Sequence, residues 1–157
     1  MRWDDIMQQN IKFLPAEKQS CYFLLDYYNQ RNPIGKVYNY QNGYAEVFSL
    51  TSLLKSIELM TDAYQNSENR FFIEPDEKNN DIVFTNQHFD IKENYGHIAT
   101  FKISVLFSQR NSWQGVITWI EKDMSLCFRS VYELINLIDN VAVSSDKQTH
   151  EYKMLKI

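Results

Sequence analysis

Apolar and polar residues alternate along several stretches of the chain, with the period of two that is typical of half-buried β-strands. The clearest stretch runs from Phe101 to Phe107, and a shorter one runs from Met124 to Phe128. Between them, residues 116–120 are rich in β-branched and aromatic side chains, and short polar turns separate the stretches. This part of the chain is therefore predicted to form three antiparallel strands.

A helical pattern follows the third of these strands. Ser130 and Glu133 have the spacing of a capping box, in which each side chain accepts a hydrogen bond from a free backbone N–H at the start of a helix. Apolar residues then recur on one helical face, at Val131, Leu134, Ile135, Ile138 and Ala142. We expect a helix that ends near residue 142, followed by a polar, flexible tail over 143–157.

The same order of elements occurs earlier in the chain. An apolar stretch begins at Cys21, further strand-like runs end at Tyr40 and Phe48, and a helical pattern starts at Ser49. Landmarks recur at nearly constant separation: Gln-Arg-Asn at 30–32 and 109–111, 79 residues apart, and two Gly and two Phe 80 residues apart (Gly35 and Gly115, Phe48 and Phe128). We infer an internal duplication with a one-residue slip in a loop. In this interpretation the first copy has drifted and only the second keeps its capping box.

These patterns predict an α+β protein built from a duplicated βββα module. A three-stranded sheet with one helix buries its apolar face imperfectly, so we expect the two copies to pack about a pseudo-twofold axis. The prediction is a single compact domain, 1–157, that contains two three-stranded antiparallel sheets, each followed by a helix. The copies span about 20–64 and 97–142. The polar stretch 65–96, with apolar runs at 71–73 and 82–84, is predicted to be a linker with an inserted hairpin.

The composition indicates a folded, acidic protein. Of its 157 residues, 44% are hydrophobic and 15% aromatic, which argues against disorder. The net charge is −4 and the Lys and Arg residues are dispersed along the chain, so binding to nucleic acid is disfavoured. No apolar stretch approaches the roughly 20 residues of a membrane span, and the first residues lack the pattern of a signal peptide. We therefore expect a cytoplasmic protein with no membrane partner. Homodimers through unpaired strand edges are a further possibility.

The residues that usually carry catalysis do not form a recognisable constellation. His88, His97 and His150 lack the spacing of a metal site, and the chain contains no glycine-rich phosphate loop or serine elbow. Cys21 and Cys127 lie on predicted strands in apolar surroundings, as core thiols do. We accordingly predict no enzymatic activity, no metal and no cofactor.

One loop has the composition of a binding surface. The segment 109–115 combines Arg and Trp, which dominate binding hot spots, and a further Trp follows on the next strand. The alternative is that the Trp at 113 packs down over the hairpin, with glycine at 115 allowing an unusual backbone. An aromatic and Arg-bearing counterpart lies in the first copy. The candidate binding residues are Arg110, Trp113, Gln114, Trp119, Arg31 and Tyr40.

The second copy also resembles a group of short, uncharacterised proteins of Gram-positive bacteria that are often carried on mobile elements. The resemblance covers about 97–142 and rests on Trp113-Gln114-Gly115, Thr118-Trp119, Phe128-Arg129-Ser130, Glu133-Leu134-Ile135 and Leu137-Ile138-Asp139. It implies an accessory role in element maintenance or against host defence. Together these observations predict a non-catalytic adaptor or inhibitor that binds a protein partner. The alternative is an accessory regulator that binds nucleic acid through its sheet and loops, where Tyr and Arg could stack on bases.

Overall fold

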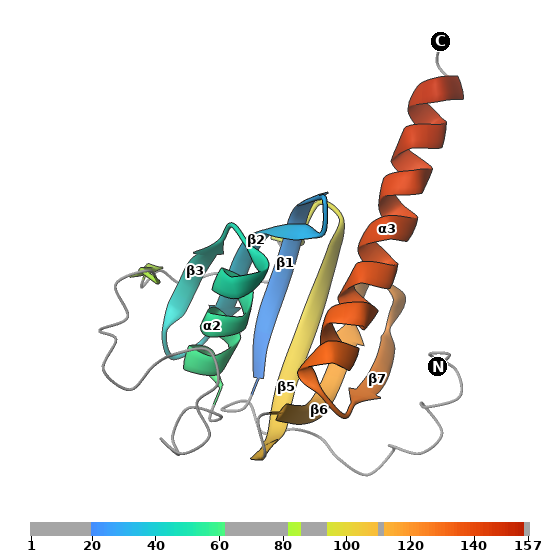
Figure 1. The fold of residues 1–157 in the computed structure, drawn as a ribbon. Coiled ribbons are helices and arrows are strands. Elements are labelled where there is room, and N and C mark those ends of the chain that lie inside the picture. Colours follow the sequence, from blue (N-terminus) through green and yellow to red (C-terminus); the bar gives the residue numbers. More distant parts are fainter. Residues whose placement is uncertain (1–19, 62–81, 86–93, 110–111, 156–157) are drawn as a thin grey trace.

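The computed structural model describes residues 20–61, 82–85, 94–109 and 112–155. These residues form one seven-stranded sheet in the order β4-β3-β2-β1-β5-β6-β7, with helices α2 and α3 on the same face (Figure 1). The elements in chain order are β1 (Ser20–Asn29), β2 (Asn32–Asn39), β3 (Gly43–Val47), α2 (Leu50–Met60), β4 (Phe84–Thr85), β5 (Ala99–Gln109), β6 (Ser112–Trp119), the 3₁₀ turn η5 (Ile120–Lys122), β7 (Met124–Phe128) and α3 (Val131–Leu155).

The core lies between the sheet and the two helices. Alternate residues of the central strands are fully buried on this side, including Phe23 on β1 and Phe101 on β5, whose rings stack at 6.3 Å between centroids. Leu53 of α2 and Leu134 of α3 complete the core from above. The predicted α+β class is therefore confirmed, and the alternation predicted for residues 101–107 marks a real strand.

The predicted division into two separate sheets is wrong, because β1 pairs directly with β5. Six residue pairs join them antiparallel, among them Tyr22 opposite Lys102. Each strand would otherwise be the open edge of a three-stranded sheet, with unpaired N–H and C=O groups. Joining the two edges satisfies these groups and gives both helices one continuous sheet to cover. Strand periodicity could not reveal this, since it shows which face is buried and not which edges pair.

The two halves of the sheet correspond closely at a separation of 80 residues. The β1–β2 hairpin and the β5–β6 hairpin each carry a register shift at the same place. A glycine lies beside each shift: a Cβ on Gly35 would lie 1.8 Å from the carbonyl oxygen of Leu24, and a Cβ on Gly115 would lie 1.8 Å from that of Ser104. Any side chain at either position would therefore collide with the neighbouring backbone.

The turns of these hairpins have equal length, which contradicts the predicted one-residue slip. Asn29 pairs with Asn32 in the first hairpin, and Gln109 pairs with Ser112 in the second. Gln30 therefore corresponds to position 110, so the two Gln-Arg-Asn triplets are one residue out of register. The two glycines are equivalent, but the triplets are not. Common ancestry of the two halves stays a prediction.

The Phe landmark is also misplaced. Val47 lies opposite Gly35 and Phe128 lies opposite Gly115, so Val47 is the structural counterpart of Phe128. Both are 1% exposed, whereas Phe48 is 58% exposed. The turn between the second and third strands is therefore one residue longer in the second half, where Trp119 pairs with Met124, than in the first, where Asn39 pairs with Gly43.

Both helices begin with a serine cap. The Ser49 hydroxyl accepts a hydrogen bond from the backbone N–H of Ser52, whose own hydroxyl accepts one from the N–H of Ser49. In α3 the Ser130 hydroxyl accepts from the N–H of Glu133, and the Glu133 carboxylate accepts from the N–H of Arg129. The expectation that only the second half kept its cap is therefore wrong, because a serine replaces the usual Glu or Gln in the first.

The end of α3 also differs from the prediction. The helix continues to Leu155 and extends past the sheet, where a tail over 143–157 was expected to begin (Figure 1). No Gly or Pro interrupts 131–155, and Lys, Gln and Glu favour the helical backbone. Of the predicted insertion at 65–96, the run ending at 84 contributes to β4, which pairs with β3. The run at 71–73 lies outside the described residues.

Candidate functional site

The loop and strand of the second half do not form the predicted binding surface. Trp113 is 0% exposed and belongs to the core, as the alternative interpretation had it, so its prediction as a surface anchor is wrong. Strand alternation turns its side chain toward the helices. Arg110 lies outside the described residues.

The remaining candidates do not gather in one place. Gln114 is exposed and alternates with the inward-facing Trp113, so it lies on the sheet face away from the helices. Trp119 packs partly against the core, with Lys122 Nζ 5.9 Å from its ring centroid. Tyr40 is 73% exposed and follows β2 in the other half of the sheet. These positions therefore offer separate contacts and no common site.

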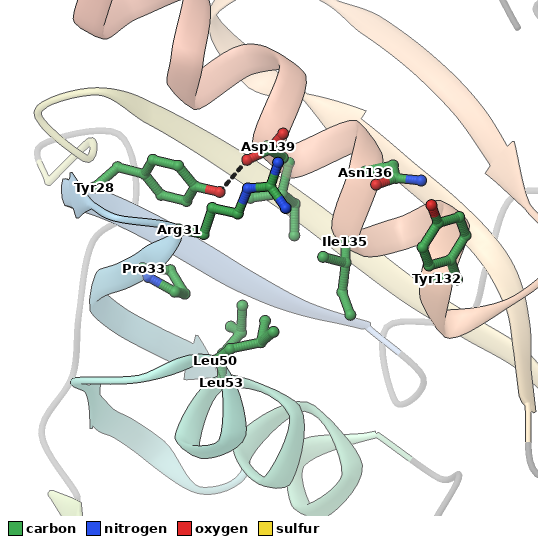
Figure 2. Close-up of a pocket in the computed structure, with 10 residues that line it drawn as sticks. Tyr28, Arg31, Pro33, Leu50, Leu53, Tyr132, Ile135, Asn136 and Asp139 are labelled. Carbon is green, nitrogen blue, oxygen red and sulfur yellow. Dashed lines mark hydrogen bonds between the residues drawn. The ribbon is translucent and has the colours of Figure 1, made fainter.

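Arg31 is the exception, because it lines a pocket. The pocket has a volume of about 290 Å³ and lies between α2 and α3, above the end of the β1–β2 hairpin (Figure 2). Arg31 is in the turn of that hairpin, so the chain places it at the mouth of the gap between the two helices. The pocket thus draws on three elements that are distant in sequence.

Apolar side chains form the floor of the pocket. Leu50 and Leu53 come from the first turns of α2, where the spacing of three residues puts them on one face. Ile135 and Ile138 come from α3 by the same spacing, and Pro33 comes from β2. Each helix covers the sheet with the apolar face that carries these residues. The pocket is the space between the two helices that their side chains do not fill.

The polar wall contains a hydrogen bond between the sheet and α3. The Tyr28 hydroxyl donates to Oδ1 of Asp139. Burial raises the pKa of Tyr28 above its ordinary 10.0, the hydrogen bond and negative charge of Asp139 raise it further, and Arg31 opposes the shift. Tyr28 therefore stays protonated at neutral pH and keeps one carboxylate oxygen of Asp139 occupied.

The Arg31 guanidinium is held at the pocket by an unusual turn. Gln30 and Arg31 have φ values of 52° and 64°, as a two-residue type I′ hairpin requires. Sequences such as Asn-Gly are strongly preferred there, and a left-handed conformation costs an ordinary residue about 1–2 kcal/mol. Among the described residues the guanidinium has no hydrogen-bond or ion-pair partner, and Figure 2 shows it extending from the turn toward Asp139.

The rim opposite Arg31 is aromatic and polar. Tyr132 is 73% exposed on the first turn of α3, and Asn136 follows one turn later. The pocket lining holds no Cys, Ser or His that could act as a nucleophile or a base near neutral pH. Within the described ranges, no three His, Cys, Asp or Glu side chains are placed to share a metal ion. The groups that the lining offers to a ligand are a guanidinium, a carboxylate, an amide, phenol hydroxyls and apolar side chains.

Sequence reasoning identified only Arg31 among these residues. Tyr28 and Asp139 are 111 residues apart. Asp139 is part of Leu137-Ile138-Asp139, on which the sequence resemblance partly rests, but neither residue was a candidate for binding. The sequence contains one weak indication of the site: Asp139 is an acidic residue directly after Ile138, beside the apolar face of the predicted helix. Its partner could not be inferred without knowing that α3 crosses the end of β1.

No described helix is long and apolar enough to cross a membrane. With the fold and the pocket in view, we compared the chain with models of protein families, with curated proteins and with solved structures, and none of the three comparisons finds a match.

Proposed function

We propose that this protein is a non-catalytic interaction protein that binds a protein partner through the pocket between α2 and α3. The pocket itself is the observation that carries the proposal. It combines an apolar floor with the exposed Tyr132 and with an Arg31 guanidinium that has no hydrogen-bond or ion-pair partner among the described residues, and Tyr and Arg are among the residues enriched at binding hot spots.

The size of the pocket suits one anchoring side chain. Burying an aliphatic or aromatic side chain there would contribute about 1.5–3 kcal/mol. The rim then supplies directional contacts that distinguish partners. The net charge of −4 favours a partner with a basic surface. A nucleic-acid-handling enzyme has such a surface, and this protein would then act as its acidic adaptor or inhibitor. Element maintenance or action against host defence is the context that the sequence resemblance adds to this proposal.

Two tyrosines provide a matched test. Tyr132 lies at the pocket rim, Tyr40 lies outside the pocket, and both are 73% exposed. Immobilised wild-type, Tyr132→Asp and Tyr40→Asp proteins are incubated with extract of the native cell, and retained proteins are quantified by mass spectrometry. We expect Tyr132→Asp to lose a partner that Tyr40→Asp retains. Identical retention by all three proteins would refute the pocket as the interaction site.

A second candidate function is supported by a row of aromatic residues on the sheet face away from the helices. Tyr44, Tyr38, Tyr22 and Lys102 are successive register partners across β3, β2, β1 and β5. Lys102 Nζ lies 5.9 Å from the Tyr22 ring centroid. Tyrosines with nearby cations on a sheet can stack single-stranded bases. The acidic charge and the 2% exposure of Tyr38 weigh against this function.

Anisotropy of a labelled single-stranded oligonucleotide at low and high salt tests the second candidate. Binding that falls steeply with salt and is lost in Lys102→Glu would favour the nucleic-acid regulator over the interaction protein. We expect no binding at physiological salt.

A further inference from the structure

A positive and a negative group line the same pocket, together with an apolar floor. Arg31 contributes a guanidinium with no described partner, and Asp139 contributes a carboxylate with one oxygen engaged by Tyr28. A ligand that fits must offer an anion and a hydrogen-bond donor close together. It must also carry an apolar group on the same small framework, because Leu50, Leu53 and Ile135 line the same pocket as both charged groups (Figure 2).

The backbone conformation of the turn indicates that the position of Arg31 has a use. A glycine at 31 would relieve the positive φ of 64° at no steric cost. Strained positions of this kind cluster at binding sites, where the surrounding structure holds them. Here the strain brings a guanidinium over a pocket that has an apolar floor.

We propose that the pocket binds the carboxyl-terminal residue of a polypeptide whose last side chain is apolar; this inference rests on the proposed function. Its terminal carboxylate pairs with the Arg31 guanidinium, which presents two parallel donors. Its backbone N–H donates to Asp139, and its side chain lies on Leu50, Leu53 and Ile135. Within a polypeptide, only the carboxyl-terminal residue offers an anion, a donor and a side chain on one carbon atom; a free amino acid offers the same groups and is an outcome of the test below. An internal residue has no anion, and an aliphatic acid has no donor.

The size of the site is consistent with a single residue. A pocket of about 290 Å³ is at the lower end of small-ligand sites, which span about 300–1,000 Å³. The exposed rim at Tyr132 leaves a path for the preceding residues of the partner to leave the pocket.

Three small probes test the proposal by NMR titration of the full chain at low ionic strength. They are acetyl-Gly-Gly-Leu with a free carboxylate, its carboxamide, and free leucine. We expect the carboxylate peptide to bind at least about tenfold more tightly than the carboxamide, since the hydrogen bonds to a charged group are lost. Equal binding of acid and amide would overturn the proposal. Tighter binding of free leucine than of the peptide would overturn the polypeptide as ligand and assign the pocket to an amino acid.

Two turn variants separate the role of the guanidinium from that of the turn. Arg31→Gly removes the guanidinium and suits the type I′ turn, so the variant folds and we expect its unfolding temperature to rise by about 2–4 °C. It should bind the carboxylate peptide at least about tenfold more weakly. Gln30→Gly relieves strain one residue earlier and keeps Arg31, so it should bind as the wild type does. Wild-type affinity in Arg31→Gly would also overturn the proposal.

The outcomes for the peptide and for the proposed function are distinguishable. Suppose the peptide fails to bind while the Tyr132→Asp protein still loses a captured partner. The terminal-residue inference is then wrong and the interaction function stands. If the peptide binds and no captured partner depends on Tyr132, the terminal-residue inference holds and the proposed interaction function is wrong.

Discussion

Tyr28 on β1 donates a hydrogen bond to Asp139 on α3, although 111 residues separate them. The bond joins the sheet to the helix at the polar end of the pocket (Figure 2). It also fixes the orientation of the carboxylate that we assign to ligand recognition. The relationship therefore serves both the packing of α3 and the geometry of the site.

Replacing Tyr28 by Phe should lower the free energy of unfolding by about 1–2 kcal/mol, because Asp139 loses the donor to its partly buried carboxylate. Urea unfolding at pH 7 measures the change. Tyr27→Phe is the matched control, since Tyr27 is 64% exposed and its hydroxyl bonds to no described residue. Equal stability of the two variants would show that the bond contributes nothing.

Substituting alanine for Gly35 or Gly115 should destabilise the protein by more than about 3 kcal/mol. The added Cβ would lie 1.8 Å from a backbone carbonyl oxygen in each hairpin, and backbone on both strands would have to move. Gln114→Ala, next to one of these glycines and exposed, should stay within about 0.5 kcal/mol of wild type. Thermal unfolding monitored by circular dichroism compares the three. Tolerance of alanine at either glycine would contradict the close approach at the bulge.

Trp113→Ala should act on stability and not on binding. The side chain is 0% exposed, so its loss leaves a large cavity and costs about 3–5 kcal/mol. Trp113→Phe should cost less because it keeps part of the volume. Denaturant unfolding gives both values. A stable Trp113→Ala protein that loses a partner would instead restore the surface role predicted from the sequence.

Stability should fall at alkaline pH in part through Cys21. Burial raises the pKa of the Cys21 thiol from 9.0 to about 12. The unfolded chain therefore releases this proton first, so the contribution is complete below about pH 9 and is lost as the pH rises toward 12. Urea unfolding of wild type and Cys21→Ala between pH 8 and pH 11 tests this. We expect the two stabilities to converge as the pH rises, and parallel profiles would contradict the buried thiol.

Much of the local structure was predictable from short-range patterns. Alternation located the strands of the second half, and the apolar face from Val131 to Ala142 located the packed part of α3. The serine and glutamate at its start marked the cap. These features depend on neighbouring residues, so the sequence carries them directly. The continuation of α3 to Leu155 was missed because a polar helix has no apolar face to reveal it.

The site was predictable only in one residue. Arg31 was identified through its resemblance to the later Gln-Arg-Asn, although the register shows that the triplets are not equivalent. Trp113 was assigned to a surface because a loop was expected where β6 already begins. Tyr28, Asp139 and the floor of the pocket required the positions of three elements at once.

The sequence by itself determined the order of strands and helices, the faces they bury and the starts of both helices, because periodicity and capping act over a few residues. Only the tertiary structure decided that β1 pairs with β5 to make one sheet, and that a pocket remains between α2 and α3. Strand pairing depends on satisfying backbone groups across a separation of about 80 residues, and a pocket depends on the volumes that side chains from distant segments fail to fill. Neither the strand pairing nor the pocket can therefore be inferred from any short segment of the sequence.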